Sequence, residues 1–129
     1  METSAVTPRK RQIVIVDDNA DLAWFFAEIL KLHGYEALVF ADPVAALKHV
    51  LSQTTDAVIC DLQMPQLDGD LLYATVERSK PELVRRFLFV TAAADEARYQ
   101  HFLGTVEAPV LLKPVAVESL LAEIERLTR

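Results

Sequence analysis

Five short apolar runs recur along the chain, each rich in β-branched or aromatic residues. Continuous runs of this length are typical of strands that are covered on both faces of a parallel sheet. No Asn-Gly turn joins consecutive runs, which argues against hairpins. The sequence therefore predicts five strands, at residues 13–16, 37–40, 57–60, 87–90 and 110–112.

Helical patterns follow the predicted strands. In the first pattern the residues at i, i+3 and i+4 spacing form an apolar stripe, and Gly34 stands at its end as a stop signal. The stripe consists of Leu22, Phe25, Phe26, Ile29, Leu30 and His33. Helices are expected at about 20–33, 43–51, 70–79, 95–103 and 117–127. Strands that alternate with helices predict an α/β fold, a doubly wound five-stranded parallel sheet with five helices.

The length and composition fit a single domain. The chain has 129 residues and a formal net charge of −6, which argues against nucleic acid as a direct partner. We expect a flexible N-terminal tail at 1–11 and one domain at 12–129. No apolar stretch reaches the roughly 18 residues of a membrane span, and a lone cysteine, Cys60, suits a reducing compartment. A cytoplasmic protein without membrane contact is expected.

Polar side chains follow four of the predicted strands. Asp17 and Asp18 follow the first, Asp61 the third, Thr91 the fourth and Lys113 the fifth. The carboxyl ends of parallel strands lie along one edge of the sheet, so these residues should meet there. Two carboxylates about 4 Å apart repel by about 4 kcal/mol at an effective dielectric constant near 20. Three together predict a Mg²⁺ site and phosphoryl transfer to a carboxylate, with the lysine as a phosphate contact.

Other interpretations share part of this pattern. Taken singly, an aspartate after a strand is most often a turn or helix-cap residue. A Mg²⁺-dependent phosphohydrolase of the haloacid dehalogenase type also uses an aspartyl nucleophile after a strand, but it requires a second aspartate where this chain has Gln63. A flavodoxin-type carrier requires a phosphate loop after the first strand, where Asp17 and Asp18 would repel the phosphate.

From residue 12 to residue 127 the chain resembles the receiver domain of two-component response regulators. The motifs that carry the resemblance are Asp17-Asp18-Asn19, Cys60-Asp61-Leu62-Gln63-Met64-Pro65, Thr91-Ala92 and Lys113-Pro114. The resemblance implies the flavodoxin-like receiver fold with strand order 2-1-3-4-5. It also implies a cis peptide bond between Lys113 and Pro114.

The resemblance further implies a role for each site residue. Asp61 is expected to accept the phosphoryl group. Asp18 and Asp61 are expected to hold Mg²⁺ directly, with Asp17 acting through water and the backbone carbonyl of Gln63 as a further ligand. Lys113 is expected to contact the phosphoryl oxygens, and the Thr91 hydroxyl to move toward them.

The same resemblance implies the partners. The phosphoryl donor would be a histidine kinase or a histidine phosphotransfer protein, and the output an altered binding to a downstream protein. The chain is compatible with a free-standing regulator or with part of a longer protein such as a hybrid kinase. Trp24 falls opposite the apolar stripe of the first helix, where it could contact the kinase or pack against a neighbouring element.

One position departs from the family pattern. Receivers often have an aromatic residue three positions before the lysine, and this chain has Val110 there. A valine cannot vacate a large pocket by one rotamer change, so we expect switching mainly through the loop after the fourth strand and the helix that follows. Gln63 lies at a position that in similar receivers flanks the attacking water and affects dephosphorylation. It could orient that water or be a solvent-facing loop residue.

Overall fold

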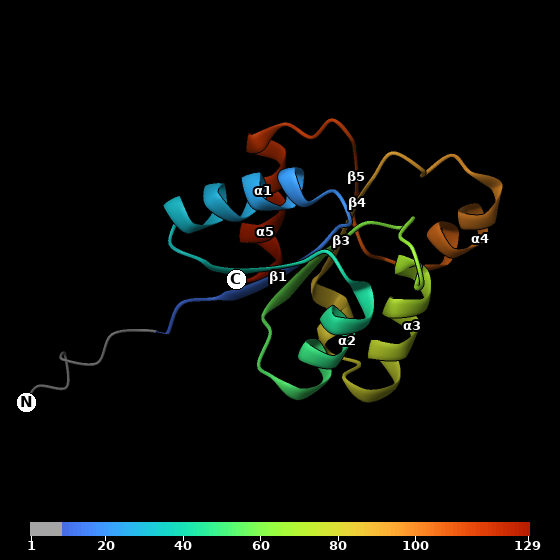
Figure 1. The fold of residues 1–129 in the computed structure, drawn as a ribbon, viewed down its shortest axis with the longest axis horizontal. Coiled ribbons are helices and arrows are strands. Elements are labelled where there is room, and N and C mark those ends of the chain that lie inside the picture. The colour runs from blue at the N-terminus through green and yellow to red at the C-terminus, as the bar shows by residue number, and fades with distance from the viewer. Residues whose placement is uncertain (1–8) are drawn as a thin grey trace, which may run out of the picture.

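The computed structural model describes residues 9–129, which form a parallel sheet between two layers of helices (Figure 1). The strand order β2-β1-β3-β4-β5 confirms the predicted order and the α/β fold class. The strands are β1 (Gln12–Val16), β2 (Glu36–Phe40), β3 (Ala57–Cys60), β4 (Phe87–Thr91) and β5 (Val110–Leu112).

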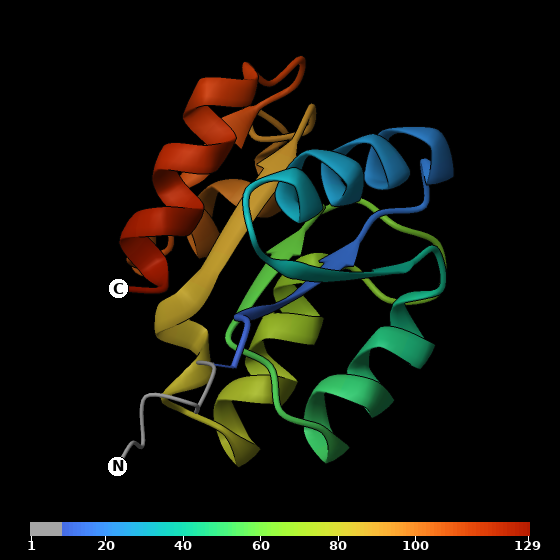
Figure 2. The same ribbon diagram turned by 90° about the vertical axis from the view of Figure 1, so that its left-hand side faces the viewer.

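Five α-helices cover the sheet within the described part of the chain. One face carries α1 (Ala20–Leu32) and α5 (Val117–Leu127), and the other carries α2 (Pro43–Ser52), α3 (Gly69–Ser79) and α4 (Ala97–Thr105) (Figure 1 and Figure 2). A 3₁₀ turn, η2 (Leu83–Arg86), precedes β4 and was not predicted, because one turn is too short to show a period.

Successive strand residues feed two separate apolar cores. Val14 and Val58 pack with α2 and α3, whereas Ile13, Ile15 and Ile59 pack with α1 and α5. This alternation follows from the two-residue period of a strand. Both faces of β1, β3 and β4 are covered, so these strands read as continuous apolar runs, whereas the edge strands β2 and β5 expose Leu38 and Leu112.

Capping residues set the start and end of the first helix. The side-chain oxygen of Asn19 accepts a hydrogen bond from the Leu22 backbone amide at 3.2 Å, so α1 begins directly after the acidic pair. Gly34 has a φ of +91°, a conformation that glycine adopts without strain, and it ends the helix as predicted. At the fourth helix the agreement is looser, because the predicted start at residue 95 lies two residues before the observed start of α4.

The predicted apolar stripe of α1 is wrong at Phe25 and at His33, which is exposed and lies just after the helix. The buried residues of the helix are Ala23, Phe26, Ala27 and Leu30, and 44% of Phe25 is exposed. Ala23 and Ala27 belong to the buried face, and with 3.6 residues per turn that face is centred on the side of the helix away from Phe25. Trp24 is 62% exposed, as expected for a residue opposite the stripe.

Part of the predicted N-terminal tail, residues 1–8, lies outside the described residues. Arg9 forms a two-pronged ion pair with Asp56, at 2.9 and 3.1 Å between guanidinium nitrogens and carboxylate oxygens. Asp56 also accepts a hydrogen bond from the Gln12 amide at 2.7 Å.

No helix among residues 9–129 has both the length and the apolar character needed to cross a membrane.

Candidate phosphoacceptor site

The sheet brings the predicted site residues to one edge. In the register of β1 and β3, Val16 pairs with Cys60, so Asp17 and Asp61 leave neighbouring strands at the same level. The Asp61 amide donates a hydrogen bond to the Val16 carbonyl at 3.0 Å, which fixes this alignment. The strand ends therefore place two aspartates side by side.

The three carboxylates form one cluster. Each of Asp17, Asp18 and Asp61 offers an oxygen, and these oxygens all lie within 4.8 Å of one another. Asp17 and Asp61 are buried, with 3% and 7% exposed, whereas Asp18 faces solvent. The cluster thus has a buried floor and an open side.

Lys113 lies between the two buried carboxylates. Its Nζ is 2.9 Å from Asp17 Oδ2 and 2.9 Å from Asp61 Oδ2. The backbone also holds this strand end, since the Lys113 amide donates to the Thr91 carbonyl at 3.0 Å. The peptide bond between Lys113 and Pro114 is cis, as predicted. One ammonium group is thus shared by two carboxylates.

Burial and charge act in opposite directions on these groups. Burial raises the pKa of Asp17, and the hydrogen bond and charge of Lys113 offset this only in part. Burial lowers the pKa of Lys113, but the hydrogen bonds and charges of Asp61 and Asp17 outweigh it and leave that pKa raised. Lys113 is therefore an ammonium ion at neutral pH, and its charge offsets part of the cost of burying the Asp17 carboxylate.

Local backbone contacts orient the Asp61 carboxylate. Its Oδ1 accepts a hydrogen bond from the Leu62 amide at 2.6 Å, while its Oδ2 faces Lys113. Gly69, at the start of α3, donates its amide to the Leu62 carbonyl at 2.7 Å. A β-carbon at Gly69 would overlap the Asp61 carbonyl oxygen, so only glycine permits this approach.

Thr91 stands apart from the other predicted site residues. It is fully buried, and its hydroxyl oxygen accepts a hydrogen bond from the Ala93 amide at 3.0 Å. Among the described residues the hydroxyl makes no hydrogen bond to Asp17, Asp61 or Lys113. Thr91 thus contacts Lys113 only through its backbone carbonyl among these residues, and its side chain is directed to the loop that follows β4.

The donor set fits a hard cation. Three carboxylates in contact range, two buried and one open to water, are the oxygen ligands that Mg²⁺ prefers. The carbonyl of Gln63 stays a predicted ligand.

A polar cluster that the sequence patterns did not predict lies beside the site. A groove of about 450 Å³ is lined by Asp18, Gln63, Met64, Pro65, Asp68 and Arg98. Arg98 lies in α4, and its guanidinium nitrogens are 3.7 Å from Asp68 Oδ2 and 3.3 Å from Glu96 Oε1. No spacing rule in the sequence links α4 to the loop after β3, so the contact emerges only from the tertiary fold.

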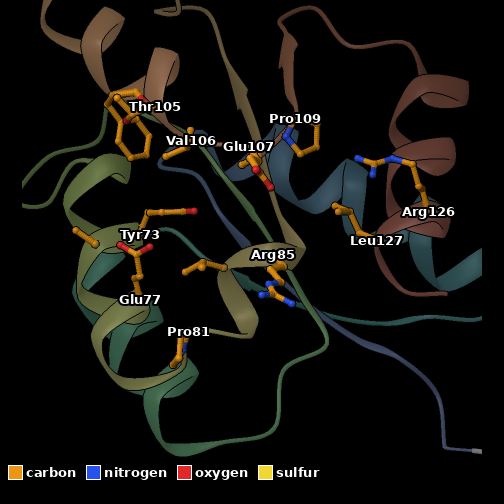
Figure 3. Close-up of a pocket in the computed structure, with 14 residues that line it drawn as sticks. Tyr73, Glu77, Pro81, Arg85, Thr105, Val106, Glu107, Pro109, Arg126 and Leu127 are labelled. Atoms are coloured by element: carbon orange, nitrogen blue, oxygen red, sulfur yellow. The ribbon is translucent and has the colours of Figure 1, made fainter.

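A larger groove of about 750 Å³ lies at the opposite edge of the sheet, between α3, η2, α5 and the connection from α4 to β5 (Figure 3). Charged residues of both signs line it, among them Glu77, Arg85, Glu107 and Arg126. It contains none of the clustered aspartates, so the chemistry of the carboxylates belongs to the other end.

Comparisons with known proteins agree with this geometry. The family model of the response regulator receiver domain matches residues 13–125. A receiver domain protein (CheY-like) from Methanospirillum hungatei has the same fold, with a TM-score of 0.83, 24% identity and coverage of 92% of this chain and 94% of that chain. The response regulator TrrA from Thermotoga maritima, solved in complex with Mg²⁺-BeF, gives a TM-score of 0.78 at 24% identity, covering 91% and 98%. At such identities the likeness concerns the fold alone.

Curated relatives extend the comparison to sequence. The response regulator receiver protein CpdR from Brucella abortus is 26% identical over 117 residues, which are 91% of this chain and 96% of that protein. The sensor kinase/phosphatase CqsS from Vibrio cholerae is 40% identical over 60 residues, which are 46% of this chain and 9% of that protein. The chain spans about half the length or less of several relatives that it matches.

Proposed function

The chain belongs to the response regulator receiver domain family, and on this basis we propose that it accepts a phosphoryl group on Asp61. The donor is a histidine kinase or a histidine phosphotransfer protein, and the output is altered binding to a downstream protein. One observation carries the proposal: the Asp61 carboxylate lies within 4.8 Å of two further carboxylates and shares an ammonium group with one of them. Family members of this kind are typically phosphoacceptor modules rather than enzymes.

The proposed transfer is a substitution at phosphorus. An oxygen of the ionised Asp61 attacks the phosphorus atom of phosphohistidine, and the bond from phosphorus to the imidazole nitrogen breaks with its electron pair on nitrogen. Lys113 neutralises charge on the phosphoryl oxygens, which requires it to leave at least part of its present contact with Asp61.

Mg²⁺ is the proposed cofactor. It would be held by Asp18 and Asp61, by Asp17 through water and by the Gln63 carbonyl, and when bound it would offset the negative charge of the carboxylates and the incoming group. The Mg²⁺-BeF complex of the Thermotoga maritima fold relative supports this assignment. The exposed side of Asp18 leaves room for water ligands and phosphoryl oxygens.

Trp24 is the proposed contact for the phosphoryl donor. It is exposed on α1, the helix that begins directly after the acidic pair. Kinase partners are supported by the sensor kinase/phosphatase among the relatives. The proposed compartment is the cytoplasm, where the buried thiol of Cys60 would stay reduced.

We expect Trp24→Ala to slow transfer from a cognate phosphohistidine donor several-fold while leaving labelling by acetyl phosphate unchanged. A large aromatic side chain carries much of the energy of a docking contact, and a small donor needs no docking. Leu32→Ala, at the far end of the same helix and also exposed, is the matched control. Equal transfer rates for the parent and Trp24→Ala would contradict the docking role.

The phosphoacceptor proposal is tested with acetyl phosphate and Mg²⁺. The parent should gain one phosphoryl group per chain, stable in acid and removed by hydroxylamine, whereas Asp61→Asn should gain none. Chelation of Mg²⁺ should abolish the labelling. Repeated turnover of acetyl phosphate or of phosphate esters without an accumulated phosphoprotein would instead favour a phosphohydrolase with an aspartyl nucleophile.

A further inference from the structure

The side chain of Gln63 bridges from the site to α4. With its amide oriented so that both ends are satisfied, Gln63 donates a hydrogen bond to Glu96 Oε2 at 3.2 Å and accepts one from Arg98 Nη2 at 2.7 Å. Its own backbone amide is 3.4 Å from Asp61 Oδ1. The residue thus sits at the mouth of the site with both polar ends of its side chain engaged.

Arg98 is the centre of this contact. Besides Gln63, its guanidinium reaches Glu96 at the start of its own helix and Asp68 in the loop before α3. The guanidinium also lies over the ring of Tyr99, with 4.7 Å between Arg98 Cζ and the ring centroid. Several weak contacts to one planar group fix its position better than any single exposed ion pair would.

The groove lined by Gln63, Asp68 and Arg98 is open to water on the side of Asp18. Water that hydrolyses a phosphoryl group on Asp61 must approach through an accessible part of the site, and Gln63 is the neutral hydrogen-bonding side chain on the wall of this groove. An amide orients such a water with an N–H or an oxygen lone pair that points toward it, and each end of the amide can make two hydrogen bonds. The contacts with Glu96 and Arg98 use one hydrogen bond at each end and so fix both ends toward α4 and the residue that caps it.

We propose that Glu96 and Arg98 are positioning residues that hold the Gln63 amide away from the attacking water and so lengthen the lifetime of the phosphoryl group. We call the contact of Gln63 with Glu96 and Arg98 the clasp, and its effect on the lifetime rests on the proposed function of Asp61. In the hydrolysis a water oxygen attacks phosphorus, the bond to the Asp61 oxygen breaks with its electron pair returning to the carboxylate, and a water proton passes to solvent. A free Gln63 amide speeds this step by orienting the water.

The kinetic test uses the phosphorylated chain after removal of acetyl phosphate. We expect Arg98→Ala and Glu96→Ala to lose the phosphoryl group about threefold to tenfold faster than the parent, where tenfold corresponds to about 1.4 kcal/mol. The double variant Gln63→Ala with Arg98→Ala should decay like Gln63→Ala alone. Arg126→Ala, whose guanidinium pairs with Glu123 on α5, is the matched control and should decay like the parent.

Two outcomes overturn the clasp. One is an Arg98→Ala rate equal to or below that of the parent. The other is the same acceleration in the Gln63→Ala background, which would show that Arg98 only blocks water. Because 51% of the Arg98 side chain is exposed, its removal should leave the fold intact.

A second measurement detects the clasp without phosphorylation. In the unphosphorylated parent the side-chain amide resonances of Gln63 should differ from those of the exposed Gln66, and Arg98→Ala should shift them toward the Gln66 values. Unchanged Gln63 resonances would contradict the clasp even if Asp61 is labelled. A chain with shifted resonances that takes up no phosphoryl group would contradict the proposed function and, with it, the effect on lifetime.

Discussion

At the scale of single residues, the site is an electrostatic compromise centred on Lys113. One ammonium group contacts two buried carboxylates at 2.9 Å each, while Asp18 contributes a further negative charge from the surface. The carboxylates repel one another, because their oxygens lie within 4.8 Å, and the buried groups lose their hydration. The arrangement therefore lowers stability in the absence of a cation, which is typical of a site kept for function.

The charge of Asp17 should destabilise the fold at neutral pH. Burial raises its folded pKa above the ordinary value of 3.8, so its stabilising contribution is full below that value and is lost as pH rises through the folded pKa. We expect Asp17→Asn to raise the melting temperature by a few degrees at pH 7 in a chelating buffer. The gain should disappear below about pH 4.

Asp56→Asn is the comparison variant, and its effect on the melting temperature at pH 7 should have the opposite sign. The hydrogen bond and charge of Arg9 lower the pKa of Asp56, so its contribution is present above 3.8 and is lost as pH falls through the folded pKa. This variant should melt at a lower temperature than the parent at pH 7, and the difference should shrink in acid. A loss of stability in Asp17→Asn at pH 7 would contradict the account of the buried cluster.

Gly69 should tolerate no side chain. A β-carbon there meets backbone rather than a movable side chain, so Gly69→Ala should cost about 3 kcal/mol in the free energy of unfolding, measured with denaturant. Gly104 in α4 faces open space, with no neighbouring atom within 4 Å of where a β-carbon would lie, and Gly104→Ala should stabilise the chain by about 0.5 kcal/mol. Similar stabilities for the two variants would show that the loop before α3 can move aside.

At the scale of elements, α4 is the helix best suited to move. Tyr99 is its single buried residue, and half-buried Phe102 adds edge-to-face contacts with Tyr73 and Phe89, at centroid distances of 5.4 and 5.5 Å. Elements with few buried contacts open most easily. Receivers often have an aromatic residue at the position in β5 where this chain has Val110. We therefore expect phosphorylation to act on α4 through the loop after β4.

Thr91→Ala should uncouple α4 from the phosphorylated site. In the parent, phosphorylation should change amide hydrogen exchange in α4 and in the loop before it, because we expect the Thr91 hydroxyl to exchange its hydrogen bond with the Ala93 amide for one to the phosphoryl group. The variant should be labelled at Asp61 without that change. Thr75→Ala, which removes a hydroxyl bonded to the Leu71 carbonyl in α3, is the control. A full exchange response in Thr91→Ala would contradict this route.

Sequence patterns predicted some elements better than others for physical reasons. The central strands were found because both of their faces are buried, which makes 57–60 and 87–90 continuous apolar runs. The start of α4 shifted by two residues because a turn at 94–95 directly precedes the helix, and the border between a turn and a helix is poorly marked in a sequence. Phe25 is exposed because Ala23 and Ala27 belong to the buried face of α1, and a search for large apolar residues at helical spacing passes over alanines.

At the scale of the whole molecule, the strand order brings the residues of the site together. Asp17 and Asp61 are far apart along the chain but adjacent at the carboxyl ends of β1 and β3. The same rule predicted that the aspartates and Lys113 would meet, because it depends only on strand order. It could not predict the contact of Arg98 with Gln63, which depends on how a helix packs over a loop.

The most direct test is to locate the acyl phosphate in the chain. The parent is labelled with acetyl phosphate and Mg²⁺ and treated with hydroxylamine, which converts an aspartyl phosphate into a hydroxamate that mass spectrometry of the peptides can place. We predict a hydroxamate at residue 61 and none at residues 17 and 18. A mark at either of those two aspartates, or no mark on a chain that consumes acetyl phosphate, would contradict the account.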